Sequence, residues 1–361
     1  MKKIKLFDPV YDQNEEKAIQ NVLKSKKWAS GSGVGLVEKF ENKFKKYIDS
    51  KDCVAVNSGT SALNLAMSTI DVKNKEVLVP SLTFVSTIHS IIINGGKPVF
   101  VDVEPDTLCI DHNKISELIS RKTKVCLPVH FAGMSCNLTK LKKIAKDNKI
   151  TIIEDAAHAT GTKFAGKKIG SHGELVCFSF HPVKNLAMPN GGLIAINDKN
   201  YKKIRKELLS KRWCGITNRN GSKYDVKKLG WNYYMNDFSA GIGLEQLKKI
   251  EKLNSIRRKI AKQYDKEITI EQKIPFSNNC SYHLYWILVK NREKFMNKMY
   301  DAGIETGIHY KPVHTMSMYK TKKRLPVTEL IGKQIVTIPM HPNLSERDID
   351  RIIFCVNKFA K

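Results

Sequence analysis

A lysine and an aspartate that follow apolar segments are the residues of this chain best suited to carry chemistry. Lys184 lies just beyond the run "LVCFSF", on a loop closed by two glycines, and Asp155 ends the run "ITIIED" 29 residues upstream. An amine that can form a Schiff base and a carboxylate that keeps a pyridine nitrogen protonated are the groups that pyridoxal phosphate needs from a protein. The pair predicts pyridoxal phosphate as cofactor, with Lys184 and Asp155 as catalytic residues.

The segment "VNSGTSALNLA" offers small residues and backbone amides at the start of a predicted helix. Ser and Gly before a helix are ordinary capping residues, and this interpretation is sufficient for the segment alone. Free N–H groups and the partial positive charge of a helix N-terminus also favour a phosphate. Beside Lys184 and Asp155, the phosphate interpretation is favoured.

Two further residues each admit two interpretations. Phe84, in "VPSLTFVST", follows a strand-like run, so its ring belongs either to the core or over the face of a cofactor. His158, three residues beyond Asp155, either donates to the cofactor's phenolate oxygen or is a satisfied histidine in a turn.

The elements that must position these residues alternate along the chain. Short β-rich runs are separated by amphipathic helical segments such as 114–121 and 139–148. The runs are "DCVAV", "EVLVP", "KPVFVD", "KVCLPVHF", "ITIIED", "LVCFSF" and "GLIAIN". This order predicts an α/β fold with a mainly parallel, doubly wound sheet covered on both faces.

The rhythm changes from about residue 245. A long basic helix over 244–267, the strand-like "YHLYWILVK" and a helix over 292–302 come first. A final helix opens at Ser345, because "SERD" is typical of an N-cap followed by acidic first-turn residues. We therefore expect a large domain over 1–243 and a smaller α+β domain over 244–361.

The composition of the chain indicates in which cellular compartment the protein is expected. Its 361 residues are 42% hydrophobic, which is enough for a large core, yet no apolar stretch is long enough for a membrane span. The basic start "MKKIKLFDPVYDQ" leads into polar and acidic residues, where a signal peptide needs an apolar segment. Eight scattered cysteines without CxxC spacing are typical of reduced thiols. These observations predict a cytoplasmic protein without membrane contact or a metal site.

The net charge of +27 favours a competing class, a basic regulator that binds nucleic acid. However, only ten of the 62 basic residues are Arg, the residue suited to bidentate phosphate contacts. The lysines are spread over helix-like stretches such as "LTKLKKIAKDNK", as general solubility would require. We expect no specific nucleic-acid partner, and the regulator remains the alternative.

Nine segments, in order and nearly end to end, resemble one family, the DegT/StrS-type nucleotide-sugar aminotransferases of the fold-type I pyridoxal phosphate group. They are "KKWASGSGVGLVEKFENKF", "VNSGTSALNLA", "VPSLTFVST", "PVHFAG", "IEDAAHATGT", "FSFHPVKN", "LGWNYYMNDFSAGIGLEQL", "IHYKPVH" and "IPMHPNLSERDIDRII". The resemblance implies that Lys184 forms the Schiff base and Asp155 holds the pyridinium.

The resemblance also implies two further sets of site residues and a homodimer with shared active sites. The cofactor-binding set is Gly59, Thr60, Ser61, Phe84, Asp155, His158, Ser179, Lys184 and, from the neighbouring subunit, Asn232. The substrate-binding set is Trp28, Ser30, Gly31, His309, Tyr310 and His314.

The implied reaction moves an amino group from L-glutamate to a keto group of a nucleotide-linked sugar, with Lys184 as proton shuttle. Lys311 either meets the sugar's diphosphate or is a solvated surface lysine. The chain departs from the family at Asn190, where relatives often carry an acidic residue, and at Tyr234, where they often carry Arg. The sugar, the nucleotide and the aminated carbon therefore stay open. The presence of Lys184 argues against a sugar-deoxygenating or non-catalytic relative.

Overall fold

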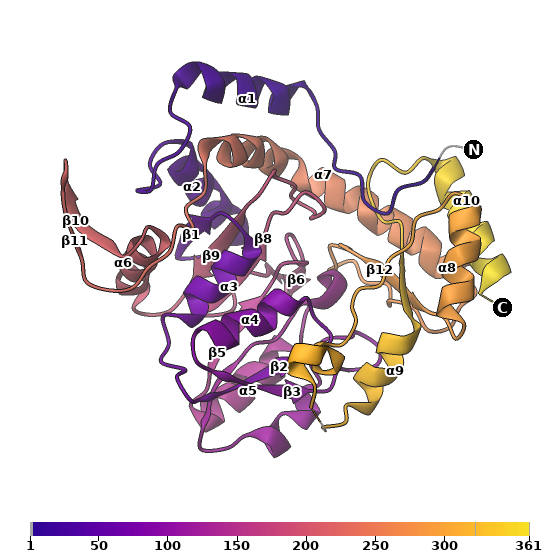
Figure 1. Cartoon of the computed structure of the whole chain (residues 1–361). Helices are drawn as coiled ribbons and strands as arrows, with labels where there is room; N and C mark the ends of the chain where they lie inside the picture. Colours follow the sequence, from indigo (N-terminus) through magenta and orange to yellow (C-terminus); the bar gives the residue numbers. More distant parts are fainter. Residues whose placement is uncertain (1–2, 322, 361) are drawn as a thin grey trace.

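A seven-stranded sheet forms the centre of the computed structural model, which describes residues 3–321 and 323–360 (Figure 1). Its strands, in spatial order, are β1 (Asp52–Val56), β9 (Gly192–Ile196), β8 (Leu175–Ser179), β5 (Thr151–Asp155), β4 (Thr123–Cys126), β2 (Glu76–Pro80) and β3 (Lys97–Val101). Strand β9 runs antiparallel to both of its neighbours, and the other neighbouring pairs are parallel. The predicted mainly parallel sheet is confirmed.

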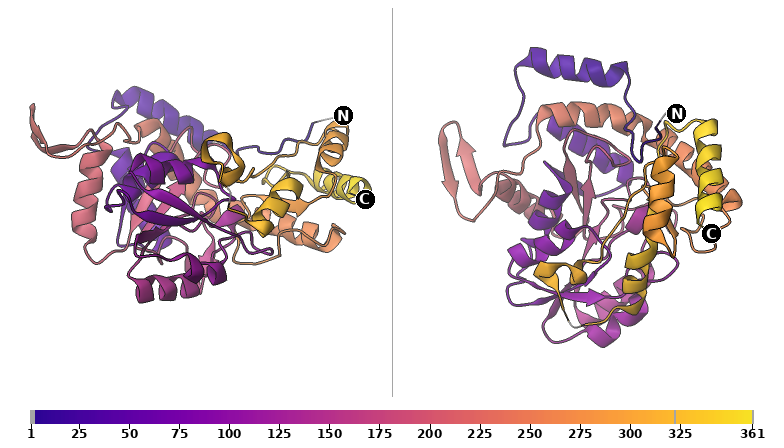
Figure 2. Two further views of the ribbon diagram at one scale, coloured as in Figure 1. Left: turned by 60° about the horizontal axis from the view of Figure 1, so that its bottom comes forward. Right: turned by 45° about the vertical axis from the view of Figure 1, so that its right-hand side comes forward.

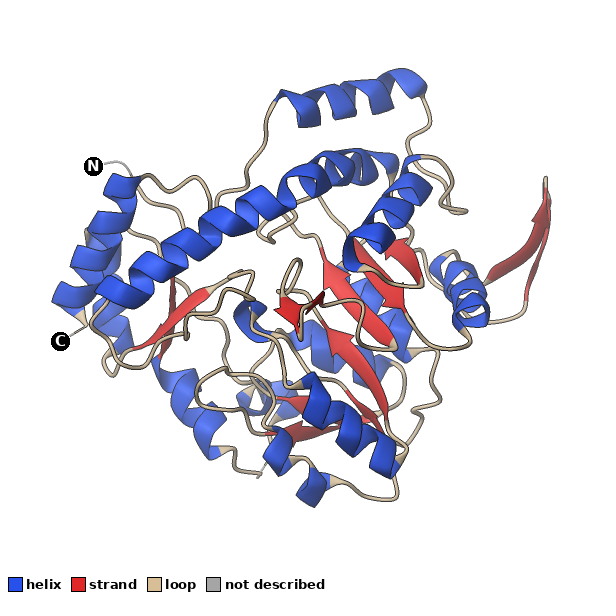
Figure 3. Cartoon of the chain, turned by 180° about the vertical axis from the view of Figure 1, so that it is seen from behind, coloured by secondary structure: helices blue, strands red, loops and turns tan. Residues whose placement is uncertain are grey.

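Helices cover both faces of this sheet, which is why β8 and β9 are buried along their whole length. One face packs against α3 (Gly59–Met67), α4 (Val85–Ile93) and α6 (Tyr201–Arg212). The other packs against α2 (Leu36–Ile48), α5 (Leu138–Asn148) and α7 (Asp237–Glu267). Figure 3 shows the chain from the α7 side, with the long helix running past the strands toward the C-terminal part. The strand order and the two helical layers together give the predicted doubly wound architecture.

Helix α7 is 31 residues long and continues from the sheet domain into the C-terminal part of the chain. It begins at Asp237, where the Asn236 side chain accepts from the Ser239 amide at 2.8 Å. The helix therefore starts seven residues before the predicted 244, and the expected domain boundary at 243/244 falls within it. Gly243 explains the difference, because glycine lowers helix propensity whereas a Cβ here would lie 2.1 Å from the Met188 side chain.

The C-terminal part is the predicted α+β assembly. Strands β12 (Tyr285–Leu288) and β13 (Ile335–Ile338) pair antiparallel, beside α8 (Arg292–Asp301), α9 (Pro326–Gln334) and α10 (Glu346–Phe359). The predicted N-cap of α10 is confirmed: the Ser345 hydroxyl accepts from the Asp348 amide, and the Asp348 carboxylate accepts from the Ser345 amide.

Two local predictions were wrong. The expected helix over 114–121 is a pair of short 3₁₀ turns, His112–Lys114 and Ser116–Leu118, the first capped by the Asp111 carboxylate. The run "KVCLPVHF" was expected to be β-rich along its length, but strand β4 ends at Cys126. Pro128 follows, and proline has no N–H to donate to a neighbouring strand. Both errors come from local capping and backbone chemistry rather than from the apolar pattern.

Several elements had no clear signal in the sequence. Helix α1 (Gln13–Ser25) lies outside α7, which it contacts, and a capping box of Asp12 and Glu15 begins it (Figure 1). Strands β10 (Ile216–Asn220) and β11 (Lys223–Val226) form a hairpin that stands away from the body of the molecule in each view of Figure 2. A smaller hairpin joins β6 (Lys163–Phe164) to β7 (Lys167–Lys168).

Two predictions on composition can be compared with the fold. Across residues 3–321 and 323–360, every helix is too short or too polar to cross a membrane. All eight cysteines are free thiols, and all but Cys214 are buried, as expected of core residues. The first two residues of the basic N-terminal segment lie outside the described part of the chain.

Candidate active site

An open cavity of about 290 Å³ lies at the carboxyl ends of β1, β2, β4, β5 and β8. Ligands of open α/β sheets bind at this edge, because the loops after parallel strands meet there. The cavity is lined by nine of the predicted site residues: Gly59, Thr60, Phe84, Asp155, His158, Ser179, Lys184, His309 and Tyr310. Loops distant in sequence thus bring most of the predicted site together.

Asp155 ends β5 and presents a buried carboxylate to the cavity. One of its oxygens accepts from the Thr87 hydroxyl at 2.8 Å, and the other from the Ala157 amide at 3.1 Å. Burial raises the pKa of Asp155, while these two donors and the Lys184 amine oppose the rise. A pyridinium nitrogen would supply the opposite charge that this buried carboxylate favours, so the site fits the predicted cofactor.

Lys184 lies on the loop between β8 and β9, where its backbone N–H donates to the His181 carbonyl in a turn. Its Nζ lies 3.3 Å from Nε2 of His283. Burial lowers the pKa of Lys184 to about 8, with the Asp155 carboxylate acting in the opposite direction. Because the free amine is the reactive form, the lowered pKa suits Lys184 to Schiff-base formation.

The N-terminus of α3 lies beside the end of β8 at one corner of the cavity. Ser58 caps the helix by accepting from the Ser61 amide at 3.1 Å. A Cβ on Gly59 would lie 2.6 Å from the Ser179 Cβ, so only glycine allows this close approach. The first turn of α3 and the Ser179 hydroxyl therefore border the same space, which fits the phosphate of the cofactor.

His158 lines the cavity with its tautomer set by the backbone. Its Nδ1 accepts from the Ala132 amide at 3.2 Å, so the proton of the neutral ring is on Nε2, which lies 3.1 Å from the Tyr310 hydroxyl. Burial, with Lys184 and His309 adding to it, lowers the pKa of His158 well below its usual value. A neutral ring with Nε2–H can donate to a phenolate oxygen in the cavity.

Phe84 stands at the cavity wall rather than in the core. Its side chain is 56% exposed, and its ring lies 5.9 Å from the ring of Tyr310. Of the two interpretations made from the sequence, core packing is wrong. The position leaves the ring free to cover one face of a bound pyridine.

Six predicted site residues lie outside this cavity. Trp28 and Asn232 are exposed, Ser30 is half-buried, and Gly31, Ser61 and His314 are buried. The Ser61 hydroxyl donates to the Asn57 side chain at 2.6 Å, and His314 Nδ1 lies 2.6 Å from the Ser81 hydroxyl. The roles of all six stay predictions, and the buried position of His314 does not favour substrate contact.

The loop that carries Trp28 packs on the start of α7. Trp28 is 52% exposed, and its ring lies 5.9 Å from that of Phe238. A Cβ on Gly31 would overlap the Trp213 ring, which holds this loop beside the sheet. Asn232 is exposed, and its backbone carbonyl accepts from the Asn57 side chain at 3.3 Å. These residues border a surface of the protomer rather than its cavity.

The sequence reasoning missed His283 and Thr87, which contact Lys184 and Asp155. The local pattern predicts that His283, inside "YHLYWILVK", is a core residue of a strand and that Thr87 is an ordinary helix residue. Nothing in the sequence therefore indicated their contacts with Lys184 and Asp155. The departure at Asn190 matters for the pocket, because Asn190 lines the cavity, whereas Tyr234 and the exposed Lys311 do not.

One turn of α7 fastens three segments of the site. The Asn185 side chain donates to the Asn254 side chain at 2.8 Å, next to Lys184. Asn254 in turn donates to the Thr160 carbonyl at 2.9 Å, in the loop after Asp155. The Arg257 guanidinium donates to the Tyr282 carbonyl at 3.4 Å, next to His283. Helix α7 therefore holds the segments that carry Lys184, Asp155 and His283 at a fixed spacing.

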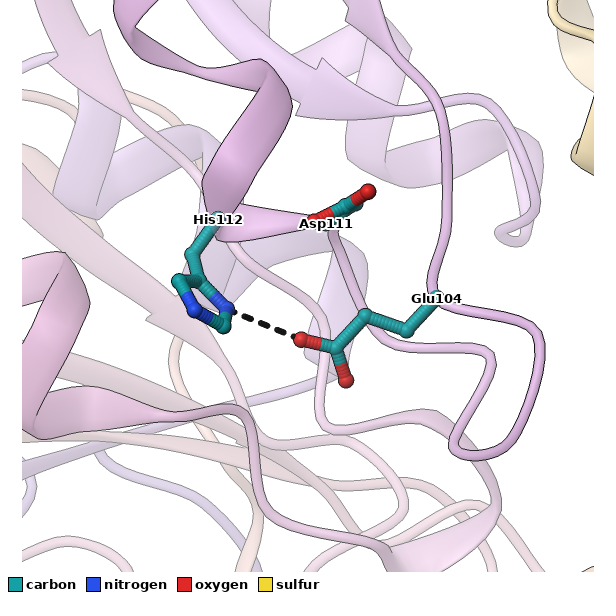
Figure 4. Close-up of side chains that lie close together, drawn as sticks. All are labelled: Glu104, Asp111 and His112. Atoms are coloured by element: carbon teal, nitrogen blue, oxygen red, sulfur yellow. Dashed lines mark hydrogen bonds and ion pairs between the residues drawn. The ribbon is translucent and has the colours of Figure 1, made fainter.

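Three residues that can ligate a metal lie together elsewhere, near the end of β3: Glu104, Asp111 and His112 (Figure 4). One Glu104 oxygen lies 2.9 Å from Nδ1 of His112, and the other accepts from the Thr107 hydroxyl at 2.7 Å. These hydrogen bonds stabilise the turn that contains the three residues, which accounts for their proximity.

Comparison with known proteins gives one consistent family. Residues 9–357 match the model of the DegT/DnrJ/EryC1/StrS aminotransferase family. GDP-perosamine synthase of Escherichia coli O157:H7 is 32% identical over 367 residues, which cover 99% of this chain and 99% of that protein.

Solved structures agree over the whole fold. Helicobacter pylori PseC, an aminotransferase involved in the biosynthesis of pseudoaminic acid, superposes with a TM-score of 0.93 at 25% identity, covering 99% of each chain. A Streptococcus pneumoniae protein assigned as a sugar aminotransferase, solved in its PLP-form and its PMP-form, reaches a TM-score of 0.93 at 26% identity for each. Both matches cover 99% of this chain and 98% of that one.

Proposed function

The chain belongs to the DegT/DnrJ/EryC1/StrS aminotransferase family, and from that premise we propose that it aminates a keto group of a nucleotide-linked sugar, with L-glutamate as donor. It is a pyridoxal phosphate-dependent aminotransferase. The names of similar proteins, GDP-perosamine synthase and an aminotransferase of pseudoaminic acid biosynthesis, support a sugar substrate made for a glycan. A nucleic-acid-binding regulator would leave the Lys184 and Asp155 cavity without purpose, and this alternative is not favoured.

The observation that carries the proposal is the placement of Lys184, Asp155 and the start of α3 around one cavity. When bound, pyridoxal phosphate supplies the electron sink for the carbanion formed at the donor's α-carbon. With the cofactor bound, Lys184 would take the proton from that carbon and deliver it to C4′ of the cofactor. Both Asp155 and His158 line the cavity; Asp155 would keep the pyridine nitrogen protonated, and the Nε2–H of His158 would donate to the phenolate oxygen.

The substrate class is tested directly with purified protein. Incubation with L-glutamate and a panel of nucleotide-linked keto sugars should yield 2-oxoglutarate and one amino sugar, both measured by mass spectrometry. Nuclear magnetic resonance of the product then assigns carbon 3 or carbon 4. Turnover of glutamate with ordinary α-keto acids, and with none of the sugars, would contradict the proposal.

The proposed active unit is a homodimer in which each subunit completes the partner's cavity. Trp28 and Asn232 are exposed and lie outside the cavity of their own protomer, which supports this arrangement. Apolar side chains within six residues of them along the chain are also exposed: Val34 at 58%, Val226 at 52% and Leu229 at 79%. Large apolar side chains that are exposed in this way favour contact with another protein surface. The free thiols support the cytoplasm as the location.

Mixing two inactive variants tests the shared site. Lys184→Ala and Asn232→Asp should each be inactive, the second because a carboxylate repels the phosphate that Asn232 is proposed to hold. After subunit exchange, about half of the dimers are mixed and contain one intact site of two, so about a quarter of wild-type activity should return. Exchange without any recovery, or full activity in a monomer, would refute the shared site.

A further inference from the structure

The geometry points to His283 as a second residue acting on the catalytic amine. We propose that Nε2 of His283 accepts a hydrogen bond from the Lys184 amine and thereby aims the amine's lone pair into the cavity. The catalytic consequence rests on the proposed function, whereas the contact itself belongs to the protein before any substrate binds.

Among the described residues, no other group hydrogen-bonds to the ring nitrogens of His283. The side chain is 1% exposed, and its Nε2 lies 3.3 Å from Lys184 Nζ. Its Nδ1 is also buried and has no hydrogen-bond partner among the described side chains and backbone groups. Within the described part of the chain, Lys184 is therefore the one hydrogen-bond partner of this buried ring.

Two other rings pack against the His283 ring. Phe7 stacks on it with ring centroids 5.9 Å apart and an interplanar angle of 19°, and the His158 ring lies 4.4 Å away. The His283 backbone N–H donates to the Ala132 carbonyl at 3.0 Å, in the loop whose N–H fixes the His158 tautomer. Because these contacts come from three separate segments, the ring cannot turn away from Lys184 without breaking the packing.

The charge around His283 keeps its ring neutral. Burial lowers the pKa of His283 well below its usual value, and Lys184, His158, Arg257 and His309 add to the effect in that order. A neutral ring protonated on Nδ1 accepts from Lys184 in both the ammonium and the amine form. With the proton on Nε2, the ring would occupy the lone pair that the reaction needs.

Three substitutions separate the hydrogen bond from the shape of the ring. His283→Gln places an amide oxygen near the position of Nε2, whereas the shorter His283→Asn reaches only the position of Nδ1. His283→Phe keeps a planar ring without an acceptor. His341→Phe is the matched control, because His341 is another buried histidine, 5% exposed, whose Nε2 lies 3.0 Å from the Lys5 carbonyl.

The first measurement uses the apoenzyme and needs no substrate. Labelling of Lys184 by an amine-reactive reagent, followed across pH by peptide mapping, should have its midpoint near pH 8 in the wild type. Loss of the acceptor removes stabilisation from the ammonium, so the midpoint should fall by about one pH unit in the Phe and Asn variants, a tenfold change in the equilibrium. The Gln variant and the His341→Phe control should keep the wild-type midpoint.

The second measurement uses the loaded enzyme. The Phe and Asn variants should lose about tenfold in kcat with the KM for the sugar unchanged, and the Gln variant should recover most of the loss. An unchanged labelling midpoint in folded Phe and Asn variants, or equal behaviour of Gln and Asn, would overturn the proposal. If the midpoints move as expected while the wild type fails on every sugar, the substrate assignment is wrong and the contact stands.

Discussion

Lys184→Ala should abolish transamination while the protein remains folded. The amine is both the attachment point of the cofactor and the base that moves the proton, so its loss should lower the rate by at least about 10³-fold. The variant should stay folded, because the side chain has one polar contact and lies at an open cavity, and most single substitutions change stability by only about 0.5–3 kcal/mol.

The sign of the stability effect follows from the lowered pKa. Below about pH 8 the folded protein holds Lys184 as an ammonium whose burial is unfavourable, and the unfolded chain keeps its lysine protonated to about pH 10.5. The wild type therefore gains stability from this residue's proton release as pH rises from about 8 to 10.5. The alanine variant should lack this rise in urea unfolding curves.

Borohydride reduction of the wild-type enzyme, followed by peptide mapping, should place the cofactor label on Lys184. The control is Lys167→Ala, an exposed lysine on the β6–β7 hairpin that lies outside the cavity, which should retain full activity. A label on any other lysine, or substantial turnover by Lys184→Ala, would overturn the assignment of the catalytic residue.

Asp155→Asn should bind the cofactor yet lose most of its half-reaction with L-glutamate. A neutral amide no longer favours the protonated pyridine nitrogen, so charge developing at the donor carbon is poorly stabilised. Removal of one such electrostatic contact lowers kcat on the order of 10²–10³-fold. Stopped-flow absorbance with glutamate alone measures this step without involving the sugar.

A graded control is Thr87→Val, which removes the hydroxyl that donates to Asp155 at 2.8 Å but keeps the side chain's shape. The loss of half-reaction rate in Thr87→Val should be smaller than in Asp155→Asn, because the carboxylate and its hydrogen bond from the Ala157 amide are retained. Near-normal turnover by Asp155→Asn with cofactor bound would mean that this carboxylate does not hold the pyridine nitrogen.

The sequence predicted the sheet because its strands are buried on both faces and therefore continuously apolar, as β8 and β9 are. Lys184 and Asp155 were predictable for the same reason, since each follows such a run and parallel strands end at one edge. The phosphate corner needed one further step, from a Ser-Gly turn to a helix N-terminus.

Other parts of the site depend on contacts between distant segments, which a local pattern does not contain. His283 meets Lys184 across 99 positions of the chain, and its neighbours in sequence are ordinary core residues. The start of α7 was missed because Gly243 is unfavourable in an isolated helix and favourable only against Met188. The β10–β11 hairpin lacks a buried face, so its sequence lacks the alternation of apolar and polar residues by which strands are predicted.

The turn of α7 between Asn254 and Arg257 has a consequence for how this enzyme type can diverge. At 1.5 Å per residue α7 is about 46 Å long, and one turn of it sets the spacing of the lysine loop, the loop after Asp155 and the segment before His283. Among the described hydrogen bonds, none joins that turn to residues 28–35 or 309–314. If residues 28–31 bind the sugar as proposed, mutations there can alter which sugar is accepted while this turn of α7 keeps the spacing of Lys184, the loop after Asp155 and the segment before His283. On this proposal, substrate choice and reaction chemistry would be inherited through separate parts of one chain.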